Sequence, residues 1–177
     1  MRNVVIVVLT LIGLSCPNVF AQNWTFNSDD LEYVIDLPTA NWRAVSRVDV
    51  HKHVEFVNGS DQDNGYLRLS KILLEVDKTA ANLFRDDEKW NLQRLPGYVA
   101  CGSCDGEAFR GRLNGRVFSY EYVSNGRTIA GRVYYLEIDK RTFYALRFTV
   151  APEKLRHALG QMDSIARSFR LRSVTPD

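Results

Sequence analysis

The sequence predicts a single α+β domain, in which an antiparallel sheet is covered by helices on both faces to form an α/β/α sandwich. Most segments alternate apolar with polar residues, whereas two segments repeat their apolar residues at helical spacing. The late strands carry apolar residues on both faces, and such strands need cover on both. With 177 residues, 45% of them hydrophobic, the chain is long enough for one ordinary core.

The first 21 residues are typical of a signal peptide. Arg2 precedes an apolar run from Val4 to Leu14, and Ala21 ends a small-residue cleavage site. The run covers about eleven residues, whereas a helix that spans a membrane needs roughly 20. We therefore expect cleavage after Ala21 and no permanent membrane anchor.

Two other fates of this segment stay open. It could persist as an uncleaved hydrophobic tail, or Cys16 could be acylated as in a bacterial lipoprotein, although Gly13 stands where such signals carry leucine. The favoured interpretation is one secreted or periplasmic globular domain over residues 22–172, followed by a loose tail at 173–177.

The first half of this domain has the pattern of short strands followed by a helix. Turn-rich segments separate the strands, and Pro96 and Gly97 end the helix. The acidic run from Asp86 to Glu88 falls opposite the apolar stripe of this helix, where we expect solvent. The predicted strands cover residues 31–38, 43–48, 53–57 and 66–76, and the predicted helix covers residues 77–94.

The second half has the pattern of successive hairpins and a closing helix. Asn-Gly pairs supply the positive φ angles that two-residue turns need, so we expect turns at Asn114 and Gly115 and at Asn125 and Gly126. Pro152 suits the first turn of the last helix. The predicted strands cover residues 107–113, 116–123, 128–138 and 142–150, and no element is expected from residue 170 onwards.

Cys101 and Cys104, in the stretch CGSC, are the chemically notable pair. Removal of Cys16 with the leader leaves only these two cysteines, and exported proteins meet an oxidising compartment. We expect a disulfide between Cys101 and Cys104 that stiffens the entry to the hairpins. A redox centre is the weaker hypothesis, because no helix begins there to stabilise a thiolate and Asp105 disfavours one.

A metal site is the other alternative for these cysteines. His51 and His53 lie two apart, so on a strand they share one face, and with Cys101 and Cys104 they would make a tetrahedral zinc set. About 50 residues separate the two pairs, and this spacing is not diagnostic. We therefore predict neither a metal nor a cofactor.

The residue patterns contain no catalytic set. The sequence has no G-x-S-x-G elbow, no carboxylate pair in an acid–base setting and no glycine-rich phosphate loop. A net charge of +2 gives no reason to expect nucleic acid as a partner. We expect a protein that is not an enzyme.

Arginine and tyrosine concentrate in the hairpin half, and this mixture is typical of recognition surfaces. Arginine stems that cover an apolar sheet surface would produce the same pattern. The residues chosen as candidate partner contacts are Arg112, Arg132, Tyr120, Tyr122 and Tyr134.

Three stretches, together with the order of the predicted elements, resemble the PsbP/Mog-like superfamily. The resemblance covers nearly the whole mature chain. They are YVIDLPTANW at residues 33–42, YYLEIDKRTFYALRFTV at 134–150 and MDSIARSF at 162–169. Pro38 and Trp42 fill the family's places after its first strand, and Ser168 and Phe169 those at the end of its last helix. The CGSC stretch departs from the family pattern.

This resemblance implies an α/β/α sandwich used as a docking module, in an exported bacterial-type member without a catalytic set. Together with the leader, it predicts a non-enzymatic binding domain of the cell envelope, whose partner is an unknown envelope protein or a small ligand. The alternative is a thiol-redox or metal-binding protein built on Cys101 and Cys104.

Overall fold

The computed structural model describes residues 24–48, 53–59, 65–103 and 105–172. The predicted signal peptide, the tail at 173–177 and the residues Cys16, His51 and Cys104 lie outside this part of the chain. Within it, helices and antiparallel strands follow one another largely as expected, which confirms the α+β class.

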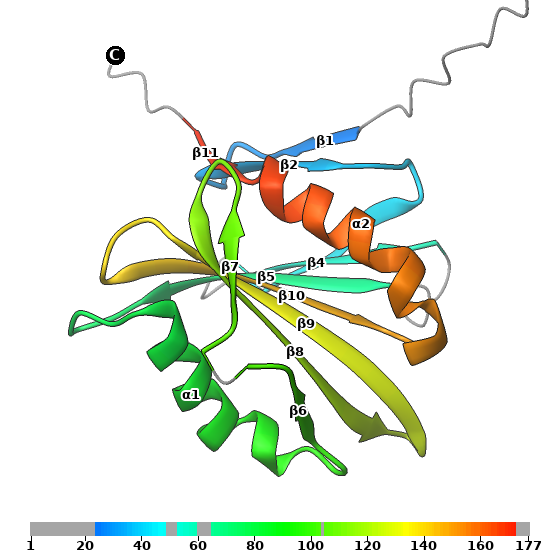
Figure 1. The fold of residues 1–177 in the computed structure, drawn as a ribbon. Helices are drawn as coiled ribbons and strands as arrows, with labels where there is room; N and C mark the ends of the chain where they lie inside the picture. The colour runs from blue at the N-terminus through cyan, green and yellow to red at the C-terminus, as the bar shows by residue number, and fades with distance from the viewer. Residues whose placement is uncertain (1–23, 49–52, 60–64, 104, 173–177) are drawn as a thin grey trace, which may run out of the picture.

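Eight of the described strands form one antiparallel sheet, which crosses the middle of Figure 1. Its order is β3-β4-β5-β10-β9-β8-β6, and β7 pairs with β8 next to β6. The long central strands are in continuous register, so that Tyr134 lies opposite Leu146 on one side and Val117 on the other. The strands are β3 (Trp42–Val48), β4 (His53–Asn58), β5 (Tyr66–Leu73), β6 (Val99–Cys101), β7 (Glu107–Arg110), β8 (Asn114–Ser124), β9 (Arg127–Glu137) and β10 (Thr142–Val150).

The side chains of this sheet contribute to two separate cores, one on each face. In β9, Val133 and Tyr135 belong to the smaller core, whereas Tyr134 and Leu136 belong to the larger one. Neighbouring residues of an extended strand point to opposite faces, and each of these four side chains is at most 1% exposed. The predicted need for cover on both faces is therefore correct.

Helix α1 (Ala80–Trp90) closes the smaller core. The hydroxyl of Thr79 caps the helix by accepting a hydrogen bond from the backbone nitrogen of Asn82 at 3.2 Å. Leu83 and Phe84 are buried against the sheet, and the ring of Phe84 stacks on Phe118 of β8 with centres 4.0 Å apart. A short 3-10 turn, η3 (Leu92–Arg94), follows the helix.

Helix α2 (Pro152–Ser168) closes the larger core together with a small sheet of three strands, ordered β1-β2-β11. The helix buries Met162, Ile165 and Ala166. Figure 1 shows the large sheet between α1 and α2. Neither helix of the described residues has the length and apolar character needed to cross a membrane. The strands of the small sheet are β1 (Trp24–Asn27), β2 (Tyr33–Leu37) and β11 (Arg170–Leu171).

The fuller description as an α/β/α sandwich is not confirmed. The described residues hold only two α-helices, and α2 shares its layer with the three short strands of the small sheet. What the structure establishes is a mixed fold built on a large antiparallel sheet.

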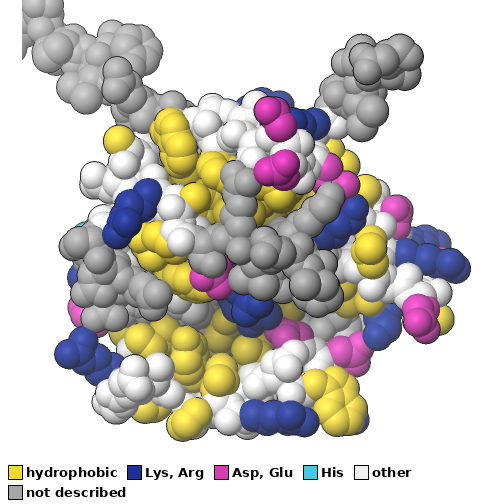
Figure 2. Space-filling model, turned by 180° about the vertical axis from the view of Figure 1, so that it is seen from behind, with side chains coloured by type: hydrophobic (Ala, Val, Ile, Leu, Met, Phe, Trp, Pro, Cys, Tyr) yellow, Lys and Arg dark blue, Asp and Glu magenta, His cyan; other side chains and the backbone are white. Residues whose placement is uncertain are grey.

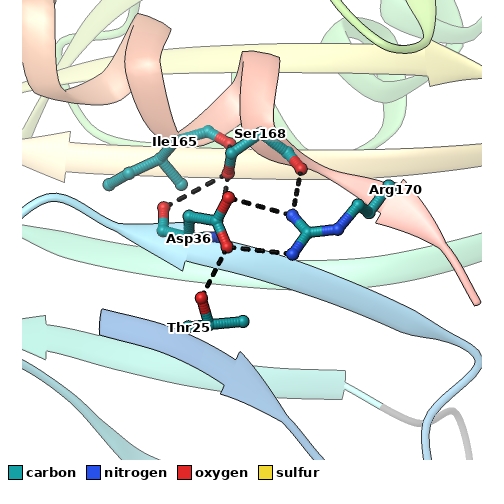
Figure 3. Close-up of polar contacts among 5 residues, drawn as sticks. All are labelled: Thr25, Asp36, Ile165, Ser168 and Arg170. Carbon is teal, nitrogen blue, oxygen red and sulfur yellow. Dashed lines mark hydrogen bonds and ion pairs between the residues drawn. The ribbon is translucent and has the colours of Figure 1, made fainter. Parts of the chain in front are cut away.

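A polar clamp fixes the end of α2 to β2 (Figure 3). Arg170 donates hydrogen bonds to the carboxylate of Asp36 at 2.9 and 3.1 Å, and the hydroxyl of Thr25 donates another at 2.9 Å. The hydroxyl of Ser168 accepts from the backbone nitrogen of Asp36 at 2.9 Å and donates to the carbonyl of Ile165 at 2.7 Å. The clamp holds β11 beside β2, so the prediction of no element from residue 170 onwards is wrong for this strand.

One predicted Asn-Gly turn is confirmed and the other is wrong. Asn125 and Gly126 adopt φ angles of 50° and 75° and join β8 to β9. Asn114 and Gly115 instead begin β8, and the chain turns at residues 111–113. Gly115 lets β8 and β9 approach closely, because a Cβ at this position would lie 2.0 Å from the carbonyl oxygen of Tyr135 in β9.

The clamp should make stability depend on pH. Burial alone would raise the pKa of Asp36, but hydrogen bonds from Arg170 and Thr25 and the charges of Arg170 and Arg112 outweigh it and lower the pKa. The stabilisation is therefore complete above about pH 4, the pKa of an unfolded aspartate, and is lost as the pH falls through the lower folded value. We expect Asp36→Asn to reduce the free energy of unfolding by about 1–3 kcal/mol at pH 7 and by less at pH 3, measured in urea. Glu137→Gln, which neutralises an exposed carboxylate, is the control. If Asp36→Asn lowered the free energy of unfolding equally at pH 7 and pH 3, the charge of Asp36 would not be what stabilises the clamp.

A methyl group should have opposite effects at two glycines. Gly115→Ala presses a Cβ against the backbone of β9, and overpacking of this kind costs about 1–3 kcal/mol. Gly160 lies in α2 with open space around a built Cβ, so Gly160→Ala should raise the free energy of unfolding by about 0.5–1 kcal/mol. Urea denaturation of both variants measures the two effects. A Gly115→Ala chain as stable as the original would contradict the close approach of β8 and β9.

Candidate functional site

A hollow of about 380 Å³ opens beside α1, on the face of the sheet that carries the smaller core. The helix packs over β8 and β9 and leaves the part of the face toward β5 open. The hollow has an apolar floor and a polar rim. Leu83, Asp87 and Trp90 line it from the helix, and Ile72, Tyr135 and Arg147 line it from the sheet.

An ion pair forms the inner wall of this hollow. Arg147 of β10 contacts Asp87 of α1 at 2.5 Å, and the same carboxylate accepts a hydrogen bond from the hydroxyl of Tyr135 at 3.0 Å. Arg147 also donates to the hydroxyl of Tyr120 at 3.1 Å. Burial, together with the charge of Asp87, raises the pKa of Tyr135 well above its usual value, so its hydroxyl keeps its proton. These groups fasten α1 to the sheet.

Trp90, at the end of α1, forms the outer wall of the hollow. The side chain is 55% exposed, and the ammonium of Lys89 lies 4.7 Å from the centre of its ring. Asp86, also on the rim, is paired at 2.5 Å with Lys78, which does not line the hollow. The exposed ring of Trp90 and the apolar residues beside it are the part of the hollow that a partner side chain can contact.

The structure separates the five candidate partner contacts, and three of them are largely inaccessible. Tyr134 and Tyr120 are 0% and 2% exposed. The side chain of Arg132 is 14% exposed and donates to the hydroxyl of Tyr134 at 2.8 Å and to that of Ser119 at 3.1 Å. Tyr134 in turn donates to Asp163 of α2. Arg132 and Tyr134 thus join the sheet to α2, whereas Tyr120 lies on the opposite face.

Arg112 and Tyr122 are the two candidates that a partner can reach. Arg112 is exposed at the turn between β7 and β8, where its backbone nitrogen lies 3.5 Å from the carbonyl oxygen of Arg167 in α2. Tyr122 is half-buried on β8, with its ring 6.2 Å from that of Tyr120. The five residues therefore do not share one surface.

The sequence patterns could not predict the hollow beside α1. Trp90 fits the apolar spacing of a core helix, and nothing local distinguishes it from a buried residue. The expectation that the run from Asp86 to Glu88 faces solvent is wrong for Asp87, whose partner Arg147 lies 60 residues away in the chain. Arg147 is a charged residue in an otherwise hydrophobic strand, on the same face as Phe143 and Ala145. This is the one signal in the sequence that could have indicated a buried partner of opposite charge.

Cys101 lies on β6, the edge strand of the large sheet, and its side chain is exposed. Cys104 lies outside the described residues, so the disulfide between the two stays a prediction. Partial desolvation and the charge of Glu121 raise the pKa of the Cys101 thiol. The metal alternative further depends on His51 and on the side chain of His53, which are not described, and the described part of the chain gathers no other set of metal ligands.

No protein-family model and no curated protein matches the sequence. Among solved structures, the chain is similar to the cyanobacterial PsbP, CyanoP, of Synechocystis sp. PCC 6803, with a TM-score of 0.59, 18% identity and coverage of 89% of this chain and 98% of that one. It is also similar to LpqN of Mycobacterium tuberculosis, involved in cell envelope biogenesis, with a TM-score of 0.55, 19% identity and coverage of 86% and 92%. A Pseudomonas aeruginosa protein of unknown function gives a TM-score of 0.53 at 12% identity, over 86% of this chain and 99% of the other. At these identities the likeness shows the fold, and it supports the PsbP-like fold that the sequence motifs imply.

Cys101 should behave as a weakly reactive thiol. Only the thiolate is alkylated, and the raised pKa keeps it scarce at neutral pH. In a reduced Cys104→Ser variant that begins at Gln22, we expect alkylation by iodoacetamide to be slow at pH 7 and still to increase beyond about pH 9. The same variant unfolded in urea is the control. A rate that reaches its plateau below pH 7 would favour the thiol-redox alternative.

Proposed function

We propose that this chain is an exported, non-enzymatic domain of the cell envelope that acts by binding another protein. The observation that carries the proposal is the hollow beside α1, where Trp90 is 55% exposed while Asp87 and Arg147 behind it are bound to each other. Tryptophan is enriched among the residues that dominate binding energies at protein interfaces. A partner side chain that enters the hollow would bury this ring and the apolar floor beneath it.

Two separate observations support an envelope location. The first 21 residues have the pattern of a signal peptide, with its charged start, apolar run and cleavage site. LpqN, which shares the fold, is a protein involved in cell envelope biogenesis. The mature domain would then be secreted or periplasmic, as an exported bacterial-type member with the PsbP-like fold.

The charge distribution favours a protein partner over a nucleic acid. On the face shown in Figure 2, Lys and Arg side chains are scattered among Asp, Glu and hydrophobic ones. A surface that binds nucleic acid gathers its positive charges into a patch or stripe. Arg112 and Tyr122 stay proposed as additional contacts, because both can be reached from solvent.

The alternative function, a thiol-redox or metal-binding centre at Cys101 and Cys104, has no support in the described residues. Cys101 lies on an edge strand, whereas reactive thiols are favoured at helix N-termini or beside positive charges. Burial and the charge of its neighbour Glu121 raise its pKa, which works against a thiolate.

Affinity capture from an envelope extract of the source cell tests the proposal. The mature chain, immobilised through a C-terminal tag, should retain one protein reproducibly, and Trp90→Ala should reduce its recovery at least tenfold, as expected for a residue that anchors an interface. Trp24→Ala is the matched control, because Trp24 is 42% exposed but lies on β1, and we expect it to leave recovery unchanged.

Three outcomes would count against this function. Equal recovery by Trp90→Ala and the original chain would exclude the hollow as the contact surface. The absence of any retained protein would argue against docking itself. Turnover of a substrate by the isolated mature chain would replace the binding function with an enzymatic one.

A further inference from the structure

The sequence contains four Asn-Gly dipeptides, which begin at Asn58, Asn64, Asn114 and Asn125. This dipeptide is chemically unstable, because the backbone nitrogen of the glycine can attack the amide carbon of the preceding side chain, and glycine has no side chain to shield that nitrogen. The attack needs a glycine N–H that is not held in a hydrogen bond and a backbone that can rotate. Asn64 lies outside the described residues, whereas the other three lie within them.

The dipeptide at Asn58 is restrained by hydrogen bonds on both of its residues. Gly59 donates its N–H to the carbonyl oxygen of Asn41 at 2.8 Å, and Asn58 donates its own to the carbonyl oxygen of Gly65 at 2.8 Å. The side-chain nitrogen of Asn58 lies 3.5 Å from the amide oxygen of Gln161 in α2. The nitrogen that would have to attack is therefore engaged, and its release requires a local opening of the backbone.

The dipeptide at Asn114 is restrained by its place inside the sheet. Gly115 has a paired strand on either side, β7 and β9. The two-residue turn at the other end of β8 makes Ser124 and Arg127 a hydrogen-bonded pair, and such pairs alternate along an antiparallel ladder. The backbone groups of Gly115 consequently point away from β9 and toward β7. Its N–H is part of that ladder, so an attack here also requires the strands to open.

The dipeptide at Asn125 has neither restraint. Asn125 and Gly126 form the tip of the β8–β9 hairpin, where both are exposed and a Cβ built on Gly126 would meet no atom within 4 Å. The pair of Ser124 and Arg127 closes the turn and leaves the N–H of Gly126 outside the ladder. Within the described part of the chain, no hydrogen bond engages this N–H or the side chain of Asn125.

We propose that Asn125 is a site of spontaneous deamidation in the folded protein, and that the fold selects it over Asn58 and Asn114. The nitrogen of Gly126 forms a bond to Cγ of Asn125 and passes its proton to the side-chain nitrogen, which leaves as ammonia. Water then opens the resulting cyclic imide at one of its two carbonyl carbons. One opening gives aspartate at position 125, and the other gives isoaspartate, in which the main chain runs through the former side chain.

The reaction changes the hairpin in two ways. Both products place a carboxylate on the rim of a hollow of about 340 Å³, which Asn125 lines together with Tyr122 and Thr149. Isoaspartate also lengthens the main chain by a carbon atom, so that a two-residue turn no longer brings Ser124 and Arg127 into hydrogen-bonding register. This chemistry does not depend on the proposed function, because it follows from the turn and not from the hollow beside α1.

Mass spectrometry of the mature chain, aged in mildly alkaline buffer and then digested in acid, tests this inference. We expect Asn125 to be converted at least tenfold faster than Asn58 and Asn114, because only there is the attacking N–H available without local opening. The same chain unfolded in urea is the control, in which the three sites should react within about threefold of one another. Comparable rates in the folded chain would overturn the inference, and so would a tenfold preference for Asn125 that persists in urea.

Hydrogen exchange of the Arg127 amide measures the effect on the turn. Asn125→Asp reproduces one product and should leave this exchange within about twofold of the original chain, because Asp-Gly forms the same turn. The isoaspartate form, separated from the aged chain by chromatography, should exchange the amide at least tenfold faster. Unchanged exchange in the isoaspartate form would show that the turn survives, and would overturn the proposed effect on the hairpin.

Discussion

Burial of β9 and β10 on both faces is the constraint on which the rest of this structure depends. Tyr134 and Tyr135 are neighbours in the chain, yet they lie in different cores. Tyr144 and Ala145 of β10 divide in the same way. Apolar surface on both sides of a sheet has to be removed from water on both sides. Helix α1 does this for one face, and α2 with the small sheet does it for the other.

The same constraint explains why so many ionisable groups take part in holding the fold. A buried tyrosine needs a hydrogen-bond partner for its hydroxyl, and three tyrosines of β9 and β10 each donate to a carboxylate. Tyr135 donates to Asp87 of α1, Tyr134 to Asp163 of α2, and Tyr144 to Glu32 next to β2. Each covering layer is therefore attached to the sheet by an aromatic side chain and an acidic residue. These three acids therefore serve to hold the covering layers on the sheet.

Local patterns in the sequence predicted what depends on local physics. Alternation located most of the strands but neither β6 nor β11, helical spacing located α1 and α2, and Asn125 with Gly126 made the turn that its dipeptide requires. Asn114 and Gly115 carry the same signal, but there the glycine serves the approach of β8 to β9, which only the paired strand reveals. The prediction of surface contacts was wrong for a similar reason. A tyrosine in a strand can face either core or the solvent, and the sequence does not say which layers will cover it. Tyr120 and Tyr134 were taken for surface residues on composition, and packing placed them inside.

The position of β11 has a consequence for the order in which the chain folds. Its neighbour β2 begins at Tyr33, whereas β11 ends only at Leu171. Loops that join distant parts of a chain close late, because their entropy must be overcome before the contact forms. The small sheet and the aromatic contact between Tyr33 and Phe169 can therefore assemble only after the whole stretch from Tyr33 to Leu171 has been synthesised. Until then, the larger core lacks its outer wall and exposes apolar surface that a chaperone could hold.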